Sequence, residues 1–207
     1  MTQETLQELL VEQLRDLYDA EKQLVKALPK LAKATQNEQL AEALRTHLAE
    51  TENQVTRLEE VFGIVGAAAK GKPCKGMKGL LEEGNEAIQE EDKGEMRDLA
   101  IIAGCQKVEH YEISAYGTIR TIAEQLDLGD AAELLQQTED EEKEADSKLT
   151  EVAISIYESV DDAEDEEVED VEEQEPARAI APRAKSGAGS KTRTAHRSKH
   201  LRSSPLR

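Results

Sequence analysis

Residues 99–123 read LAIIAGCQKVEHYEISAYGTIRTIA, and this stretch decides the fold class. Apolar residues recur in it every three or four positions, which is the period of one face of an α-helix. Glu109 and Glu112 fall on that same face, one turn apart. Because burying an unpaired carboxylate costs several kcal/mol, such groups are normally paired or bound to a metal. The stretch therefore predicts a core helix that carries an acidic site.

Three other segments show the same pattern, in which a row of apolar residues at helical spacing is interrupted by acids or a histidine. The interrupting residues are Glu21 in the first segment, His47 and Glu50 in the second, and Glu142 and Asp146 in the fourth. If the first pair of segments turns near Thr35 and the last pair near Leu128, the acids within each pair lie at matching depth to within one helical turn of about 5.4 Å. The four segments are predicted to bring the acids together inside one bundle.

Composition sets the class of protein. The chain of 207 residues has no Trp, one Phe and four Tyr, and it is rich in helix-forming residues. No segment shows the alternation of a β-strand, and none approaches the roughly 20 apolar residues of a membrane span. The first residues show neither the basic region nor the apolar core of a secretion signal, so we expect a cytoplasmic, all-α protein. Of the two cysteines, Cys105 is expected in the core, whereas Cys74 is a candidate for exposure.

Local signals mark the helix ends and the connections. The candidate start signals are the capping-box pairs Thr5–Glu8 and Asp130–Glu133 and the N-cap candidate Asn37. The candidate stop signals are Gly63 and Gly129, and Pro29 is expected to kink or end the first helix near Leu28. The link from Gly63 to about Gly94 is too long for a turn, and it contains an amphipathic piece over residues 77–89. A short loop, a long crossover and a second short loop are typical of ferritin-like four-helix bundles.

The composition changes abruptly after residue 158. Residues 159–175 carry 11 acidic and no basic side chains, and residues 176–207 carry nine Lys or Arg and no acidic side chain. Blocks of like charge with low hydrophobicity indicate disorder. We therefore divide the chain into a helical bundle over 1–158, an acidic linker over 159–175 and a basic disordered tail over 176–207. The tail is predicted to contact DNA phosphates weakly and non-specifically, to fold back on the acidic bundle, or to act only as a solubilising segment.

Several motifs resemble the YciE/YciF family of ferritin-like bacterial stress proteins. They are the run from Asp19 to Lys33, His47-Leu-Ala-Glu-Thr51, Gly79-Leu-Leu-Glu-Glu83, Gln106-Lys-Val-Glu-His-Tyr-Glu-Ile113 with Ala115-Tyr-Gly117, and Asp140-Glu-Glu-Lys143 with Asp146. The resemblance covers about residues 3–158 and does not extend to the charged tail. It implies a ferritin-like four-helix bundle, commonly paired as a homodimer, with a ferroxidase-type di-iron centre.

The residues fit such a centre only with departures from the usual pattern. Two divalent cations need several carboxylates, and ferritin-like bundles usually supply two Glu-x-x-His motifs. This chain has Glu-x-x-Glu at 109–112, Asn53 three residues after Glu50 and Ala145 three residues after Glu142. The candidate ligands are Glu21, His47, Glu50, Glu109, Glu112, Glu142 and Asp146. Oxygen-rich ligands of this kind suit two iron ions, and manganese is an alternative.

Some roles stay open at the level of sequence. His47 is either the missing nitrogen ligand or a hydrogen-bonded core histidine, and Asp146 is either a ligand or an acceptor beside one. His110 is rotated away from the apolar face, which favours a place outside the ligand set. Tyr18, one turn before Glu21, either bonds a ligand through its phenol or packs in the core.

A metal-free reading competes with the metal site. In it the acids pair with Lys22, Arg57, Lys107 or Arg120, with a dimer seam as one place for such pairs. The leading functional hypothesis is an oxidoreductase that oxidises Fe(II) with oxygen or hydrogen peroxide in stress protection. The alternatives are a non-enzymatic stress-response binding protein and a nucleic-acid-associated protein that uses the basic tail.

Overall fold

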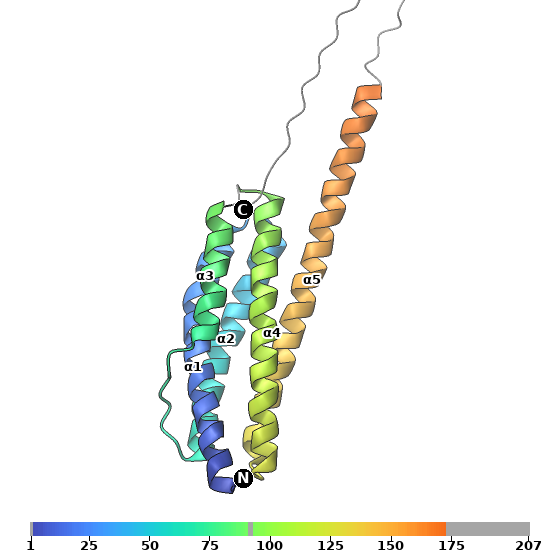
Figure 1. The fold of residues 1–207 in the computed structure, drawn as a ribbon. Coiled ribbons are helices and arrows are strands. Elements are labelled where there is room, and N and C mark those ends of the chain that lie inside the picture. Colours follow the sequence, from blue (N-terminus) through green and yellow to red (C-terminus); the bar gives the residue numbers. More distant parts are fainter. Residues whose placement is uncertain (1, 91–92, 173–207) are drawn as a thin grey trace, which may run out of the picture.

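A computed structural model of the chain describes residues 2–90 and 93–172, and these residues are helical apart from short connections. The helices are α1 (Gln3–Ala34), α2 (Glu38–Val65), α3 (Lys75–Glu90), α4 (Glu95–Gln125) and α5 (Gly129–Glu172) (Figure 1). α1, α2, α4 and α5 form a four-helix bundle, and α3 packs on α1 and α4 within the crossover between α2 and α4. The predicted all-α bundle with a helix in its long crossover is confirmed.

Two apolar clusters fill the bundle, one toward each end. The Phe62 cluster consists of Leu10, Leu14, Leu17, Tyr18, Leu58, Val61, Phe62, Val65, Tyr116, Ile119, Ile122, Ala123, Ala131, Ala132 and Leu135. The Met77 cluster consists of Ala20, Leu24, Leu28, Leu40, Leu44, Cys74, Met77, Ile101, Ile102, Cys105, Val108, Leu149, Val152 and Ile156. Each of the four bundle helices contributes to both clusters, so the middle turns of all four helices lie between them. The sequence-predicted acids belong to those middle turns.

The first two helices begin at side-chain caps. Thr2 is the N-cap of α1, and it forms a capping box in which Thr5 is the partner three residues later. The prediction that Thr5 itself starts a box with Glu8 is therefore wrong, because the chain is already helical at Gln3. The predicted N-cap Asn37 is confirmed, since its side chain accepts a hydrogen bond of 3.0 Å from the Leu40 amide. Asp98, at the start of α4, holds the same turn by accepting from the Gln36 and Asn37 amides.

The helices do not end where the sequence signals predict. α1 runs through Pro29 to Ala34, although Pro29 cannot donate to the Val25 carbonyl, because Leu28 and the residues after Pro29 still pack on the Met77 cluster. α2 also passes Gly63 and ends at Val65, and Gly66 is its left-handed C-cap with φ of 75°. Gly129 starts α5 rather than ending α4, which places Asp130 in the first turn of α5 instead of at its cap.

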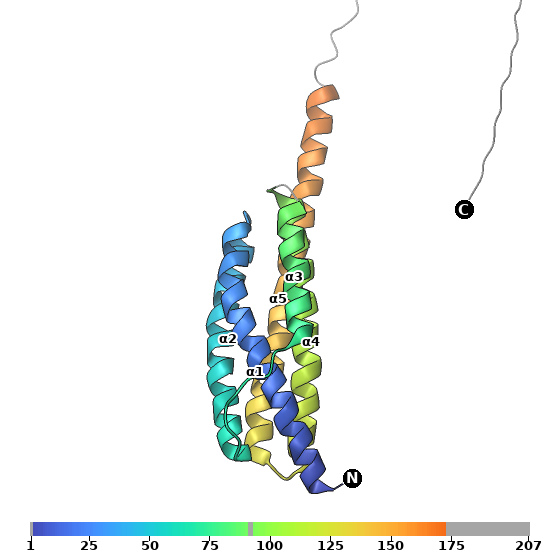
Figure 2. The same ribbon diagram turned by 60° about the vertical axis from the view of Figure 1, so that its left-hand side comes forward.

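The last helix extends beyond the predicted bundle boundary. α5 continues to Glu172, and Figures 1 and 2 show its final turns beyond the ends of the other helices. Residues 159–172 are therefore helical, not disordered as predicted, because glutamate is a strong helix former and the preceding turns are anchored in the bundle. The rest of the predicted linker and the basic segment 176–207 lie outside the described residues.

Both cysteines are buried in the Met77 cluster. The predicted core position of Cys105 is confirmed, whereas the expected exposure of Cys74 is wrong. The Cys74 thiol lies 3.0 Å from the Tyr111 hydroxyl, and its sulfur accepts from the Met77 amide. In the part of the chain that the structure describes, no helix is both long and apolar enough to cross a membrane.

Candidate metal centre

The layer between the two apolar clusters is built from acids and one histidine. Each of the four bundle helices supplies at least one of them, and all are buried: Glu21 from α1, His47 from α2, Glu109 and Glu112 from α4, and Glu142 from α5. They alternate with leucine, isoleucine and tyrosine on the inward faces of the helices, so folding the apolar clusters necessarily brings them inside. The depth prediction made from the sequence is consistent with this layer.

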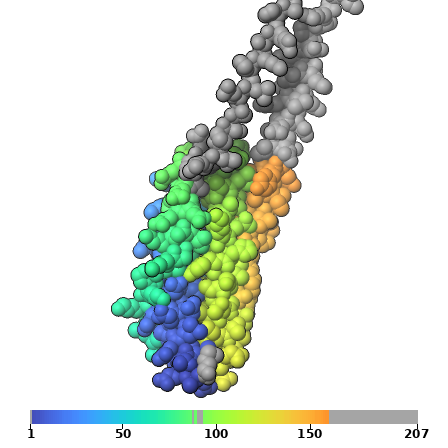
Figure 3. Space-filling model, in the orientation of Figure 1, coloured from blue at the N-terminus to red at the C-terminus, as the bar shows by residue number. Residues whose placement is uncertain are grey.

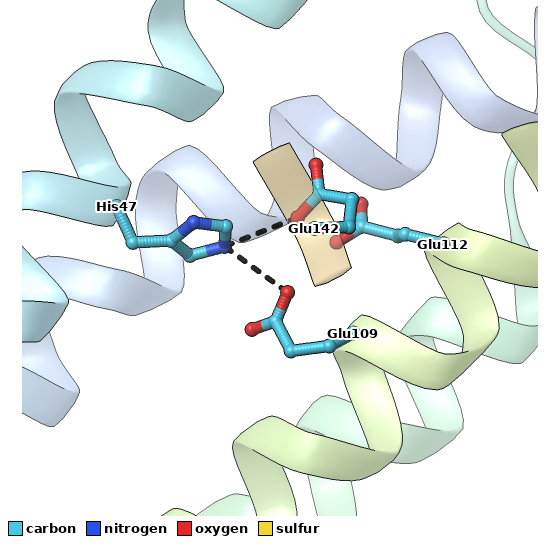
Figure 4. Close-up of side chains that lie close together, drawn as sticks. All are labelled: His47, Glu109, Glu112 and Glu142. Atoms are coloured by element: carbon cyan, nitrogen blue, oxygen red, sulfur yellow. Dashed lines mark ion pairs between the residues drawn. The ribbon is translucent and has the colours of Figure 1, made fainter. Parts of the chain in front are cut away.

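Four of these residues converge on a single point. His47, Glu109, Glu112 and Glu142 each offer a ligand atom, and these atoms lie within 4.8 Å of one another. The His47 Nε2 atom is 3.4 Å from Glu109 Oε2 and 3.8 Å from Glu142 Oε2. Figure 4 shows the imidazole reaching from α2 toward the carboxylates of Glu109 and Glu112 on α4 and Glu142. We call these four residues the four-ligand cluster.

The candidate ligand atoms of this cluster have no hydrogen-bond partners within the described structure. The atoms concerned are both ring nitrogens of His47, Oε2 of Glu109, and both carboxylate oxygens of Glu112 and of Glu142. Buried polar atoms are almost always satisfied, and a buried carboxylate left alone is especially costly. A cation bound between these atoms would satisfy them together, so the residues present fit a metal ion.

The bases proposed in the metal-free reading are engaged elsewhere. Arg57 pairs with Glu141 at 2.8 Å, Lys107 with Glu83 at 2.8 Å, and Arg120 with Glu124 and Glu139. The Lys22 ammonium lies over the ring of Tyr18, 4.8 Å from its centre. Among the described ion pairs, the only positive partner of a cluster carboxylate is His47. The described pairs therefore do not supply the neutralisation that the metal-free reading requires.

Burial and mutual repulsion change the acidity of the cluster. Burial raises the pKa of Glu142 to about 7, and neighbouring Glu21 adds to this while His47 opposes it. Burial likewise raises the pKa of Glu109 and of Glu112 well above the usual range, with repulsion from Glu142 contributing to both. Burial disfavours the charged form of His47, but the surrounding carboxylates outweigh it and raise its pKa to about 10. Without a cation, the site therefore holds protons that a metal would displace.

Glu21 lies beside the four-ligand cluster and is held by a tyrosine. The Tyr116 hydroxyl donates a hydrogen bond of 2.5 Å to Glu21 Oε1, and the other oxygen of Glu21 has no partner among the described atoms. Burial raises the pKa of Glu21 to about 7. The sequence pattern places Tyr116 on the apolar face but gives it no role. Tyr18, the phenol considered for that role, donates instead to Glu59 Oε1 at 2.6 Å.

The remaining candidates lie at the margin of the site. The Glu50 side chain is 40 % exposed, and its Oε2 atom lies 3.5 Å from His47 Nδ1. Asp146 accepts from the Gln106 amide at 3.2 Å and lies 3.5 Å from His110 Nε2, whose own side chain is 71 % exposed. The structure thus brings Glu50 to the back of the imidazole, and it places Asp146 and His110 outside the four-ligand cluster.

The arrangement is suited to binding divalent cations. It combines one imidazole nitrogen with carboxylates that can each bind one ion or bridge two, and this mixture suits iron and manganese. Four ligands on three helices, with Glu21 from the fourth helix beside them, make a site that only the folded bundle can assemble. The apolar clusters on either side limit access of water along the bundle axis.

Comparisons with known proteins agree with the geometry. A family model described as "Domain of unknown function (DUF892)" matches residues 5–160. Protein YciF of Escherichia coli strain K12 is 48 % identical over 156 residues, which cover 75 % of this chain and 94 % of the relative.

Two solved structures extend the comparison. The crystal structure of the E. coli stress protein YciF has a TM-score of 0.72 at 47 % identity, with 74 % of this chain and 97 % of that chain covered. YcfI from Rhodopseudomonas palustris, provisionally described as a structural protein, has a TM-score of 0.69 at 41 % identity, with 72 % and 94 % covered. The family resemblance read from the motifs is confirmed: the chain belongs to the DUF892 family and is related to the E. coli stress protein YciF.

Proposed function

We propose that this chain is a ferritin-like di-metal protein that oxidises Fe(II) at the buried layer in protection against stress. The observation that carries the proposal is the set of buried donor atoms without partners in His47, Glu109, Glu112 and Glu142. A salt-bridged bundle has no use for such a set, whereas cations need it. The relationship to a protein described as a stress protein supports the physiological part.

The ligands divide by position. The four-ligand cluster would hold one ion, and Glu21 beside the cluster and Glu50 beside His47 would contribute further ligands. Tyr116 fixes one oxygen of Glu21 and leaves the other oxygen available for binding. The pKa of Glu142 near 7 means that cation binding would release protons near neutral pH.

The proposed reaction balances with one oxidant. Two Fe(II) substrates each give up one electron, and one molecule of oxygen or hydrogen peroxide accepts both electrons together with protons. Bound iron supplies the one-electron redox chemistry that the side chains lack. The chain itself positions the ions, keeps water away through the Phe62 and Met77 clusters, and accepts or releases protons at the carboxylates.

A direct kinetic comparison tests this proposal. Protein loaded with Fe(II) without oxygen and then exposed to oxygen or peroxide should form ferric iron faster than the same iron in buffer. The Glu21→Ala, Glu109→Ala double variant is the control, and it should match buffer while keeping its helical circular dichroism. Equal rates for wild type and buffer would leave a bound metal without turnover.

That last outcome would favour a second candidate, a non-enzymatic protein whose metal is structural. The provisional description of the relative YcfI as a structural protein favours this candidate, and so does the position of the site between two apolar clusters. The two candidates share metal binding and differ only in whether the protein accelerates oxidation.

The proposal also includes partners that the resemblance implies or the charge pattern suggests. We expect a homodimer acting in the cytoplasm, and a weak, salt-dependent contact of residues 176–207 with DNA. Deleting residues 176–207 should leave metal binding intact and abolish any shift of DNA at low salt. A full-length protein that shifts no DNA at low salt would remove the nucleic-acid hypothesis without affecting the metal centre.

A further inference from the structure

A cavity of about 540 Å³ lies between α2 and α5 and reaches the buried layer. Its walls include Ala43, Thr46 and Glu50 from α2 and Glu144 and Ala145 from α5. His47 and Glu109, which are 5 % and 2 % exposed, form its inner end. Both ring nitrogens of His47 and Oε2 of Glu109 lack hydrogen-bond partners in the described structure. The cavity therefore joins exposed side chains to two members of the four-ligand cluster.

The groove is lined by more acidic than basic side chains, and they differ in whether they have a partner. Three of its charged residues have partners: Glu42 binds Arg45, Glu141 binds Arg57, and Lys148 binds Glu151. Glu144 is exposed and takes part in none of the described ion pairs, and Glu50 lies 3.5 Å from His47 Nδ1. Two carboxylates thus remain to attract a cation: Glu144, which is exposed, and Glu50, which lies beside the imidazole of His47.

Size also distinguishes this groove from the opposite side of the site. A cation with six waters occupies roughly 200 Å³ at about 30 Å³ per water, which the groove can accommodate. Glu109 also borders a cavity among α1, α3 and α4, but that cavity measures about 20 Å³ and its other lining is mostly apolar. Figure 3 shows α1, α3 and α4 forming a continuous face on that side. A hydrated ion fits the first route and not the second.

We infer that the groove between α2 and α5 is the port through which a hydrated divalent cation reaches the buried site. Glu144 attracts the ion at the outer part of the groove, and Glu50 receives it as it exchanges waters for His47 and Glu109. This inference rests on the proposed metal centre and adds its route of access. It requires no redox step, so it can be tested by binding alone.

The test is the rate at which Co(II) binds metal-free full-length protein, followed by stopped-flow visible absorption. Glu144→Lys should slow association roughly tenfold at low ionic strength and weaken its dependence on salt. Glu133→Lys makes the same charge change on an exposed position of the same helix face, about 16 Å away. At 0.1 M salt, where the Debye length is about 10 Å, it should change the rate less than about twofold, whereas Glu144→Lys should still slow association.

A steric pair of variants tests the same route independently of charge. Ala145→Trp should fill the groove and slow association further, whereas Ala49→Trp, at an exposed α2 position outside the groove lining, should not. Neither substitution should change the amount of Co(II) bound at saturation. If Ala145→Trp does not fold, the charge pair decides the question alone.

The outcomes separate the port from the site. Stoichiometric Co(II) binding with unchanged rates in Glu144→Lys and Ala145→Trp would overturn the port and leave the metal centre standing. A lower amount bound at saturation in Glu144→Lys would make Glu144 a ligand and also overturn the port. Wild-type protein that binds no Co(II) would overturn both the port and the proposed function.

Discussion

Two glutamates on α5, three residues apart, have opposite surroundings. Glu139 accepts hydrogen bonds of 2.8 Å from Arg120 Nε and 2.7 Å from Lys143 Nζ. Burial opposes its ionisation, but these two bases outweigh burial and lower its pKa. Glu142 is fully buried, neither of its oxygens has a hydrogen-bond partner in the described structure, and burial raises its pKa to about 7.

The contrast indicates that the middle layer is suited to binding a cation. Where this fold needs only to neutralise an acid near the core, it supplies bases, as it does for Glu139 and for Glu141 with Arg57. One turn away, around Glu142, it supplies further acids and a single histidine instead. The positive charge that balances this second group is therefore expected to come from outside the chain. We call Glu139 and Glu141 with their bases the paired layer. The metal layer consists of Glu21, His47, Glu109, Glu112 and Glu142.

The largest effect should come from neutralising one acid in each layer. Glu142→Gln should weaken metal binding roughly a hundredfold or more, because it removes a ligand and one negative charge. It should also raise the melting temperature of the metal-free protein, since an unpaired buried carboxylate is removed. The matched variant Glu139→Gln should keep metal affinity and lower the melting temperature, because Arg120 and Lys143 lose a charged partner.

Calorimetric titration and thermal unfolding of the two variants check this contrast. If Glu139→Gln and Glu142→Gln shift metal affinity and melting temperature in the same direction, the two layers do not differ as described.

An effect of intermediate size is expected when the stability of the metal-free protein is measured as a function of pH, and it should distinguish the two layers. The folded-state pKa of Glu21 and of Glu142 is raised to about 7 from 4.5, so the folded protein holds protons that the unfolded chain releases. Stability of the metal-free protein should therefore fall as pH rises from about 4.5 through about 7, at up to about 1.4 kcal/mol per pH unit for each group. His47 acts in the same direction, because the stabilisation from its raised pKa is complete below about 6.5 and is lost as pH rises toward about 10.

Chemical denaturation between pH 5 and pH 8, with chelator and with saturating Mn(II), measures this slope. Metal should reverse it, since binding improves as the ligands lose their protons. The Glu139 contribution has the opposite sign and lies below this range, because its lowered pKa adds stability that is lost only as pH falls below about 4.5. A metal-free protein whose stability does not decline across this range would show that the metal-layer acids are neutralised within the chain.

A smaller effect should follow from the tyrosine beside Glu21. Tyr116→Phe removes the donor that fixes Glu21, and it should weaken metal binding roughly tenfold, as loss of a group orienting a ligand typically does. Tyr18→Phe removes a hydrogen bond of similar length to Glu59, which is outside the metal layer, and should leave metal affinity unchanged. Competition against a chelator of known affinity gives both values, and equal losses in the two variants would remove Tyr116 from the site.

Helical periodicity is sufficient to predict the bundle and most of the metal layer. A repeat of 3.6 residues fixes the face and the level of a side chain, which is why the sequence alone places Glu109, Glu112 and Glu142 together. It does not fix the direction of a long side chain at the edge of that face. Asp146 and His110 turn toward each other for this reason, and Glu50 lies behind His47.

Features that depend on distant segments cannot be read from the pattern. Tyr116 reaches Glu21 from 95 residues away, and Asp98 holds the turn around Gln36 from 62 residues away. Pro29 locally predicts an end or a kink in α1, but the neighbouring leucines continue to pack in the Met77 cluster, and the tertiary contact overrides the local signal. The sequence offers one indication that Tyr116 contacts the site: it lies one turn after Glu112 on the same helix face.

The most direct test of the metal layer is the metal content of full-length protein purified without chelator and then titrated with Fe(II) in the absence of oxygen. We predict binding that saturates at about two ions per chain, as expected for a ferritin-like site with this many carboxylates. The Glu21→Ala, Glu109→Ala variant should bind none while remaining helical. Wild-type protein that holds no metal after purification and takes up none from excess Fe(II) would contradict a metal centre in this layer.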